Sequence, residues 1–242
     1  MSEPQPNGHS NTNKYSTIFF DLDHTLWDYE TNSQETLIEL YGSYSLQSKG
    51  IADLNLFQTE FRKVNTELWL LYDQGFIGSD VIRKERFKQI LRHFYVFDEK
   101  LSQDLSRDYL EICPRKGHLM PHAIEVLTYL SGRYRLTVIT NGFEEIQNLK
   151  LSAGNLHQFF DHIITSQKAG HRKPSKEIFD WALSKNSIPC HQAIMVGDNL
   201  IADISGARNA NIDNVFYNAE KITHASTPDF EIFSLTELRG FL

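Results

Sequence analysis

Five short apolar runs, separated by segments long enough to form helices, constrain the fold of this chain more than any other feature. The runs cover residues 17–20, 136–140, 162–165, 193–196 and 214–217. Such runs are typical of strands that are buried on both faces of a parallel sheet. Helix signals lie between them, at Pro121 to Gly132, from Asn141 to Gly154, and after Pro174 and Asn199. We therefore expect an α/β fold with a doubly wound parallel sheet.

Residues 29–113 interrupt this alternation because they contain no convincing strand. Apolar residues recur there at three- and four-residue steps, the helical period, as in Leu54, Phe57, Phe61, Val64, Leu68 and Leu71. We expect helices at about 31–41, 52–73, 79–95 and 99–112. The pattern predicts a helical subdomain inserted after the first strand, and helices that only cover one face of the sheet are the alternative. Residues 1–15, rich in Ser, Asn and Pro, are expected to form a flexible tail.

Composition excludes several classes of function. A net charge of −7 without a long basic run argues against a nucleic acid polymer as partner. The longest apolar run, 68–72, is far too short to span a membrane, and the N-terminus has no apolar signal segment. We therefore expect a cytoplasmic protein with no membrane partner. The two cysteines, Cys113 and Cys190, show no CxxC pattern and the histidines show no zinc pattern, so we expect buried thiols and no zinc.

Side chains capable of chemistry follow the ends of three predicted strands, and a lysine precedes the fourth. They are Asp21, Asp23, Thr140, Asn141, Asp198 and Asp203, with Lys173 as the lysine. Each signal alone is typical of an ordinary turn or helix cap. Ligands of an open parallel sheet bind outside the carboxyl ends of its strands, so these residues are expected to meet in one pocket.

The expected pocket has a coherent chemistry. Four carboxylates in one cleft raise each other's pKa unless cations neutralise them. Lys173 supplies one positive charge, and the oxygen ligands favour Mg²⁺ as the second cation. One carboxylate aligned with a phosphoryl group can attack it, while its neighbour protonates the leaving oxygen and then activates water. Mg²⁺, Lys173, the Thr140 hydroxyl and backbone N–H groups would hold the charge on the phosphoryl oxygens.

Four motifs in this order resemble the haloacid dehalogenase-like hydrolase superfamily over about residues 16–240. They are DLDHT at 21–25, the Thr of VITNG, the Lys of RKP and GDNLIAD at 197–203. The resemblance implies a Rossmann-like core over 16–28 and 114–242, with a helical C1 cap over 29–113. That cap would close over the site and choose substrates.

The resemblance also implies a role for each motif residue. Asp21 would be the nucleophile and Asp23 the general acid/base. Mg²⁺ would be bound by the Asp21 side chain, the Asp23 backbone carbonyl and Asp198, and Asp203 would act through water or orient the others. The phosphate would be held by Thr140, Asn141 and Lys173.

The cap sequence and two motifs beside it narrow the resemblance to the house-cleaning pyrimidine 5′-nucleotidase branch. The cap contains NTELWLLYDQGFI followed by RKERF, TLWDYE comes directly after the first motif, and VITNGFEEIQ comes later in the chain. The branch implies a small-molecule phosphate monoester, a pyrimidine nucleoside monophosphate, as substrate. Trp69, Tyr72 and Phe76 are open to two interpretations, base stacking or cap core. Arg83 and Arg86 are equally open, to substrate contact or a solvated helix face, so no base-contacting residue is predicted.

Other functions share parts of this pattern. A phosphatase or phosphomutase for another metabolite, such as a sugar phosphate or phosphoglycolate, would use the same catalytic residues. A haloacid dehalogenase needs neither Asp23 nor the Asp198 motif, and a binding protein without catalysis usually lacks a catalytic carboxylate. The sequence is compatible with a monomer or a homodimer.

Overall fold

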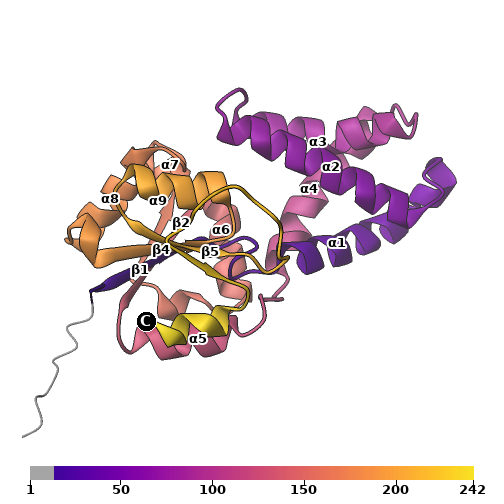
Figure 1. Ribbon diagram of the computed structural model, residues 1–242. Coiled ribbons are helices and arrows are strands. Elements are labelled where there is room, and N and C mark those ends of the chain that lie inside the picture. The colour runs from indigo at the N-terminus through magenta and orange to yellow at the C-terminus, as the bar shows by residue number, and fades with distance from the viewer. Residues whose placement is uncertain (1–13) are drawn as a thin grey trace, which may run out of the picture.

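Six parallel strands form the centre of the molecule. The computed structural model describes residues 14–242, so most of the expected tail, residues 1–13, lies outside the described residues. The strand order in the sheet is β3-β2-β1-β4-β5-β6, as Figure 1 shows. The strands are β1 Thr17–Phe20, β2 Arg135–Thr140, β3 His162–Thr165, β4 Ala193–Gly197, β5 Asp213–Tyr217 and β6 Phe230–Ile232. The doubly wound parallel sheet is confirmed. The sequence pattern does not predict β6, because a three-residue strand with Glu231 at its centre has no apolar run.

Both faces of the sheet are covered by helices, as near-continuous apolar strands require. Ile18 and Phe20 face one layer of helices, whereas Phe19, which lies between them in the strand, faces the other layer. The first layer includes α5 (Ala123–Ser131) and the 3₁₀ helix Leu235–Gly240, and the second includes α8 (Lys176–Asn186) and α9 (Gly206–Asn209). Figure 1 shows the two layers on opposite sides of the strands.

Several helices begin later than their sequence signals indicate. α5 begins at Ala123, because Pro121 and His122 form a turn in which His122 has a φ of 66°. α6 (Glu144–Ala153) begins three residues after Asn141, whose side chain bonds elsewhere instead of capping the helix. α7 (Ser166–Ala169) is a single turn that the sequence pattern does not predict.

The two cysteines do not pair with each other. Cys113 is buried and Cys190 half-buried, and both are free thiols.

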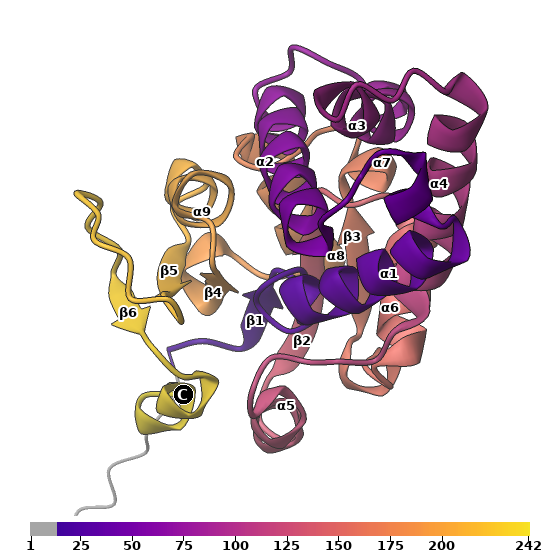
Figure 2. The same cartoon turned by 90° about the vertical axis from the view of Figure 1, so that its right-hand side faces the viewer.

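Four helices follow β1 and form a separate layer beyond the carboxyl ends of the strands (Figures 1 and 2). They are α1 (Tyr29–Ser43), α2 (Leu54–Asp73), α3 (Ser79–His93) and α4 (Glu99–Ile112). In α2, Phe57, Phe61, Val64 and Leu68 are buried, which is the helical period expected from the sequence. The inserted helical subdomain is therefore confirmed, and we call it the cap. Its boundaries at 29 and 113 stay a prediction.

The two chain segments that join the cap to the core lie side by side. Trp27 is fully buried, and its indole N–H donates to the carbonyl of Lys116 at 3.0 Å. Asn32 donates to the carbonyl of His118 at 2.9 Å and accepts from the His118 N–H at 3.1 Å. These bonds fix the cap next to the end of β1, where the first aspartates lie. Within residues 14–242, no helix has both the length and the apolar character to cross a membrane.

Candidate active site

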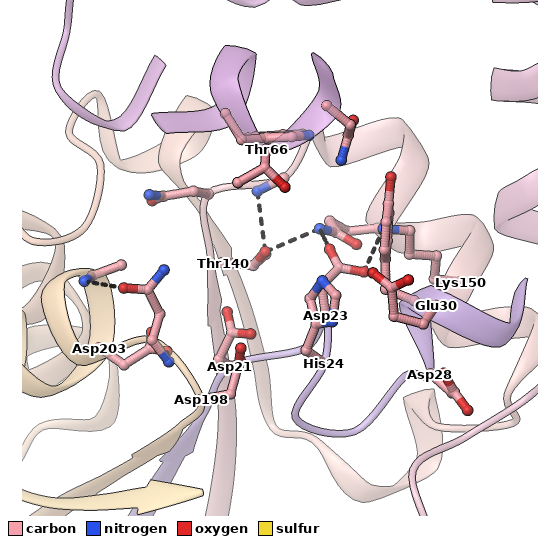
Figure 3. Close-up of a pocket in the computed structure, with 18 of the residues that line it drawn as sticks. Asp21, Asp23, His24, Asp28, Glu30, Thr66, Thr140, Lys150, Asp198 and Asp203 are labelled. Carbon is pink, nitrogen blue, oxygen red and sulfur yellow. Dashed lines mark hydrogen bonds and ion pairs between the residues drawn. The ribbon is translucent and has the colours of Figure 1, made fainter. Parts of the chain in front are cut away.

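A cavity of about 790 Å³ lies between the carboxyl edge of the sheet and the cap. Its lower wall carries Asp21, Thr140 and Asp198, which stand at or directly after the ends of β1, β2 and β4 (Figure 3). Its upper wall is formed by α2 and α3 of the cap. Parallel strands end at a common edge, and this brings residues more than 100 positions apart in sequence into one space. The volume lies within the roughly 300–1,000 Å³ of small-molecule sites.

Lys173 is the centre of a buried charge network. Its ammonium group donates to Asp21 at 2.5 Å and to Asp203 at 2.6 Å, and its side chain is only 2% exposed. Burial alone would lower the pKa of Lys173, but Asp203 and Asp21 raise it above its usual range. Lys173 therefore stays charged and fixes the position of the Asp21 carboxylate.

Asp203 is held close to β4 by the local backbone. A π-helical turn, Leu200–Ser205, carries it, and its second oxygen accepts from the N–H of Asn199 at 3.0 Å. A Cβ at Gly197 would lie 2.3 Å from this carboxylate, so only glycine allows the approach. Both carboxylate oxygens of Asp203 are therefore held, one by Lys173 and the other by the Asn199 N–H.

Three carboxylates form a candidate metal site. One oxygen atom each of Asp21, Asp198 and Asp203 lies within 4.8 Å of the others. Ligands on opposite sides of an octahedral Mg²⁺ are about 4.2 Å apart, since each Mg–O distance is about 2.1 Å. Asp198 is oriented by Thr25, whose hydroxyl donates to it at 2.8 Å. The spacing and the all-oxygen donor set fit a small hard cation such as Mg²⁺.

The protonation of these carboxylates indicates the same need for a cation. Burial, and then the nearby Asp203 charge, raise the pKa of Asp21 to about 7, although Lys173 opposes the shift. Burial and the Asp21 charge raise the pKa of Asp198 to about 6. Without further positive charge, the pocket therefore disfavours the ionised form of both carboxylates.

Asp23 has a different environment from Asp21. Lys150 donates to one of its oxygens at 2.6 Å, and Gln147 donates to the other at 2.9 Å. Burial by itself would raise the pKa of Asp23, but Lys150 and Gln147 hold it below its ordinary value. The two donors lie one helical turn apart on α6, which places both on the same face. A Cβ at Gly142 would lie 1.6 Å from the Gln147 amide, so any other residue here would push Gln147 away from its place beside Asp23.

Thr140 and Asn141 lie side by side but differ in their free donors. The Thr140 hydroxyl oxygen accepts from the Gly142 N–H at 3.1 Å and from Gln147 at 3.0 Å, which leaves its proton to donate. The Asn141 side chain accepts from the Lys173 N–H at 2.8 Å and donates to the Lys173 carbonyl at 2.9 Å. Asn141 also donates to Asp73 of the cap at 2.9 Å. Its side chain therefore holds the Lys173 segment, and phosphate contact is left to its backbone.

Three aromatic side chains that the sequence left open have three different environments. Trp69 lines the cavity and stacks on Phe143 of the core, with ring centroids 5.6 Å apart. Tyr72 is buried in the cap, and Phe76 is 74% exposed and does not line the cavity. Trp69 is thus the one of these three that can touch a ligand.

The two arginines of α3 also differ. Arg83 pairs with Glu145 of α6 and so joins cap to core. Arg86 is only 3% exposed and lines the cavity, so the solvated helix face is wrong for this residue. Sequence reasoning also missed Gln147 and Lys150. Their spacing of three after the Thr-Asn-Gly turn was an available signal, because it puts both on the helix face that the turn presents to the strand ends.

Known proteins resemble this chain over nearly its whole length. Pyrimidine 5′-nucleotidase YjjG of Escherichia coli is 30% identical over 95% of this chain and 98% of its own. Pyrimidine 5′-nucleotidase PynA of Streptococcus pneumoniae is 28% identical over 93% of both chains. A glyceraldehyde 3-phosphate phosphatase of Methanothermobacter thermautotrophicus is 30% identical over 84% of this chain and 85% of its own. The relatives therefore include both nucleotidases and a sugar phosphate phosphatase.

A solved structure shares the fold. It is that of the HAD-hydrolase YfnB of Bacillus subtilis bound to magnesium, in which interdomain movement was seen. The two chains superpose with a TM-score of 0.85 at 25% identity, over 93% of this chain and 97% of YfnB. The similarity includes the cap as well as the sheet.

The sequence pattern of the haloacid dehalogenase-like hydrolases matches residues 80–217, which is more than half of the chain. The match begins in α3 of the cap and ends at the last residue of β5, and the relatives extend the similarity to both sides of it. The chain is an enzyme of the haloacid dehalogenase-like hydrolase family.

Proposed function

We propose that this hydrolase cleaves phosphate monoesters with the help of Mg²⁺, and that its substrates are pyrimidine nucleoside 5′-monophosphates. The observation that carries the proposal is the position of the Asp21 carboxylate. It directly follows β1, is held by Lys173 and lines the cavity. The pyrimidine 5′-nucleotidases among the relatives support the substrate.

Asp21 is the proposed nucleophile. One of its oxygens forms a bond to phosphorus while the bond from phosphorus to the ester oxygen breaks, and the leaving oxygen takes a proton from Asp23, which gives an aspartyl-phosphate and the free nucleoside. Lys173 donates to one oxygen of Asp21 and so keeps the carboxylate in place for this attack. A carboxylate that is fixed before substrate arrives loses less freedom in the transition state.

Asp23 is the proposed general acid and base. It gives a proton to the leaving ester oxygen, then takes one from the water that attacks the aspartyl-phosphate. The second step releases inorganic phosphate and restores the Asp21 carboxylate. In the free protein Lys150 and Gln147 favour the ionised form of Asp23. The incoming phosphate is negatively charged, so its approach raises the pKa of Asp23 toward the value that an acid needs.

Thr140, Lys173 and the backbone of Asn141 are the proposed phosphate ligands. Thr140 and Lys173 both line the cavity beside Asp21, and Thr140 keeps its hydroxyl proton free to donate. Donors aimed at the transferring phosphoryl oxygens stabilise the charge that those oxygens carry in the transition state.

Asp21, Asp198 and the backbone of Asp23 are the proposed Mg²⁺ ligands, and Asp203 orients the others. Bound there, Mg²⁺ would neutralise the carboxylates and a phosphate oxygen. Thr25 holds Asp198 for this task, as the Asn199 N–H and Lys173 hold Asp203. The magnesium in the related structure of YfnB supports the assignment.

A substrate panel tests this function. The purified enzyme is given uridine, cytidine and adenosine 5′-monophosphates, ribose 5-phosphate, glyceraldehyde 3-phosphate, phosphoglycolate and 2-chloropropionate, with Mg²⁺ or with EDTA. We expect phosphate release, fastest from the pyrimidine nucleotides and abolished by EDTA. A preference for ribose 5-phosphate or glyceraldehyde 3-phosphate would instead indicate a sugar phosphate phosphatase, like the relative from Methanothermobacter thermautotrophicus. Halide release without a metal would favour a dehalogenase.

A further inference from the structure

Arg86 and Asn65 form a buried polar pair on the cap side of the cavity. Arg86 of α3 is 3% exposed and Asn65 of α2 is 8% exposed, and both line the same cavity as Asp21. Arg86 donates to the side-chain oxygen of Asn65 at 3.0 Å. The two helices present these side chains across from the strand ends. Thr66, next to Asn65, extends into the cavity opposite Thr140 in Figure 3.

Arg86 has more donors than the protein satisfies. Among residues 14–242 no carboxylate pairs with it, and its buried Nε has no hydrogen-bond partner. Aromatic rings surround the guanidinium instead, those of Tyr109, Phe61 and Phe87, at 4.5, 5.4 and 5.7 Å from the ring centroids. Cap packing alone would be served better by an apolar side chain, because an unpartnered buried donor destabilises a fold. The Nε itself is sealed from the cavity, so the donors left for a ligand are the other guanidinium N–H groups that Asn65 does not bind.

The pair offers mainly donors. The Asn65 oxygen accepts from Arg86, and among the described residues the Asn65 amide N–H groups have no hydrogen-bond partner. Arg86 adds the N–H groups that Asn65 does not bind. A group that fits here must present acceptor atoms, and the surrounding Trp69, Tyr109 and Leu110 suit a flat, largely apolar ring.

We propose that Arg86 and Asn65 form the base-recognition subsite, in which they donate hydrogen bonds to carbonyl O2 of the pyrimidine ring. The inference rests on the proposed nucleotidase function and extends it to named residues. Uracil, cytosine and thymine all carry O2 next to the glycosidic bond, whereas adenine carries no carbonyl. A pair of donors therefore accepts the three pyrimidines alike, without distinguishing the group at position 4 of the ring, whereas a purine offers the ring nitrogen N3 in place of a carbonyl at the equivalent position.

Removal of the donors tests this subsite. The ratio of kcat/KM for uridine 5′-monophosphate to that for ribose 5-phosphate, which has no base, is measured with saturating Mg²⁺. In Arg86→Met we expect this ratio to fall about 10- to 100-fold, mainly through KM for the nucleotide, as for the loss of hydrogen bonds to a charged group. Arg86→Lys keeps the charge but loses the fork, so we expect an intermediate ratio. Arg92→Met, the same change at an exposed position of α3, is the control and keeps the wild-type ratio.

A change in the substrate tests the contact without altering the fold. In 2-thiouridine 5′-monophosphate, sulfur, a weaker acceptor, replaces O2. We expect wild-type kcat/KM to fall at least about fivefold for this analogue relative to uridine 5′-monophosphate, and this penalty to disappear in Arg86→Met. Circular dichroism of the variant shows whether it is folded. If it is not, the wild-type comparison decides alone.

The outcomes separate this inference from the function on which it rests. If nucleotides are hydrolysed but the thio analogue is as good as its parent, the subsite is wrong and the nucleotidase stands. If wild-type enzyme prefers a substrate with a carboxylate or a second phosphate, and Arg86→Met removes that preference, Arg86 binds an anion and the pyrimidine subsite is wrong. If no nucleotide is hydrolysed while other phosphate esters are, the proposed function fails first.

Discussion

The two walls of the cavity are built in different ways. On the sheet side, the acids lie in the segments that follow strand ends, and each has a cationic, amide or hydroxyl partner, as Asp21 has Lys173 and Asp23 has Lys150. On the cap side, the polar groups lie on helix faces, and Arg86 has no acidic partner among the described residues. The acids of the sheet side have all their partners within the protein, which suits a reaction that is the same for every substrate. Arg86 of the cap side lacks such a partner, which suits recognition of a particular substrate.

The sheet side should carry the rate of the reaction. Asp21→Asn replaces the proposed nucleophile by an amide of the same shape, so we expect kcat to fall more than about 10³-fold with the fold intact. Phosphate release from uridine 5′-monophosphate measures this loss. Asp180→Asn, an exposed carboxylate of α8, is the control. Substantial turnover by Asp21→Asn would remove the division between the two walls.

The second lysine sharpens the comparison within the sheet side. Lys150→Met removes the cation that holds Asp23, so we expect kcat to fall about 100-fold, with a smaller change in KM. Lys150→Arg should recover part of the rate because it keeps the charge. Steady-state kinetics measure both variants beside Lys185→Met, a matched change at an exposed site. An unchanged kcat would mean that Lys150 only fills space beneath the cap.

The carboxylates of the sheet side should make stability depend on pH and metal. Folded Asp21 and Asp198 have pKa values of about 7 and about 6, whereas the ordinary value is 3.8. The unfolded chain therefore releases these protons first, and with EDTA the free energy of unfolding should fall as the pH rises from about 4 to 7.

Mg²⁺ needs ionised ligands, so its stabilisation should be larger at pH 7.5 than at pH 5. At 100 times its Kd it adds about 2.7 kcal/mol, a rise in Tm on the order of 5–10 °C. Thermal unfolding at the two pH values, with Mg²⁺ or EDTA, measures the difference. Equal shifts at both values would place the metal away from these carboxylates.

The smallest effect is expected where cap and core touch at the surface. Arg83→Gln removes the partly exposed ion pair with Glu145, which is worth at most about 1 kcal/mol. We expect KM to rise no more than about fivefold and kcat to stay unchanged. Lys84→Gln, whose partner Asp80 lies on the same helix, is the control. A large loss of kcat in Arg83→Gln would mean that cap position controls the chemistry.

Much of the sheet side was predictable from sequence. Residues that follow parallel strands meet at one edge of the sheet, and this does not depend on the conformation of the loops. Asp21, Thr140 and Asp198 could therefore be assigned to one pocket from the sequence alone. Lys173 was predicted by motif, and the structure adds that it bridges Asp21 and Asp203. The end of a strand is a backbone property, and the sequence reports it directly.

The cap side was not predictable in the same way. The spacing of apolar residues predicted α2 and α3, yet it left Arg86 open between substrate and solvent. Only the packing of one helix against another decides which polar residue is buried and what it meets, because a helix turns every side chain through about 100° and its neighbours set the direction. The strand-end chemistry of this protein was thus determined by the order of its residues. The partners of Asp23 and the burial of Arg86 were decided by tertiary structure, because they depend on how α6 lies beside the end of β1 and how α3 packs against α2.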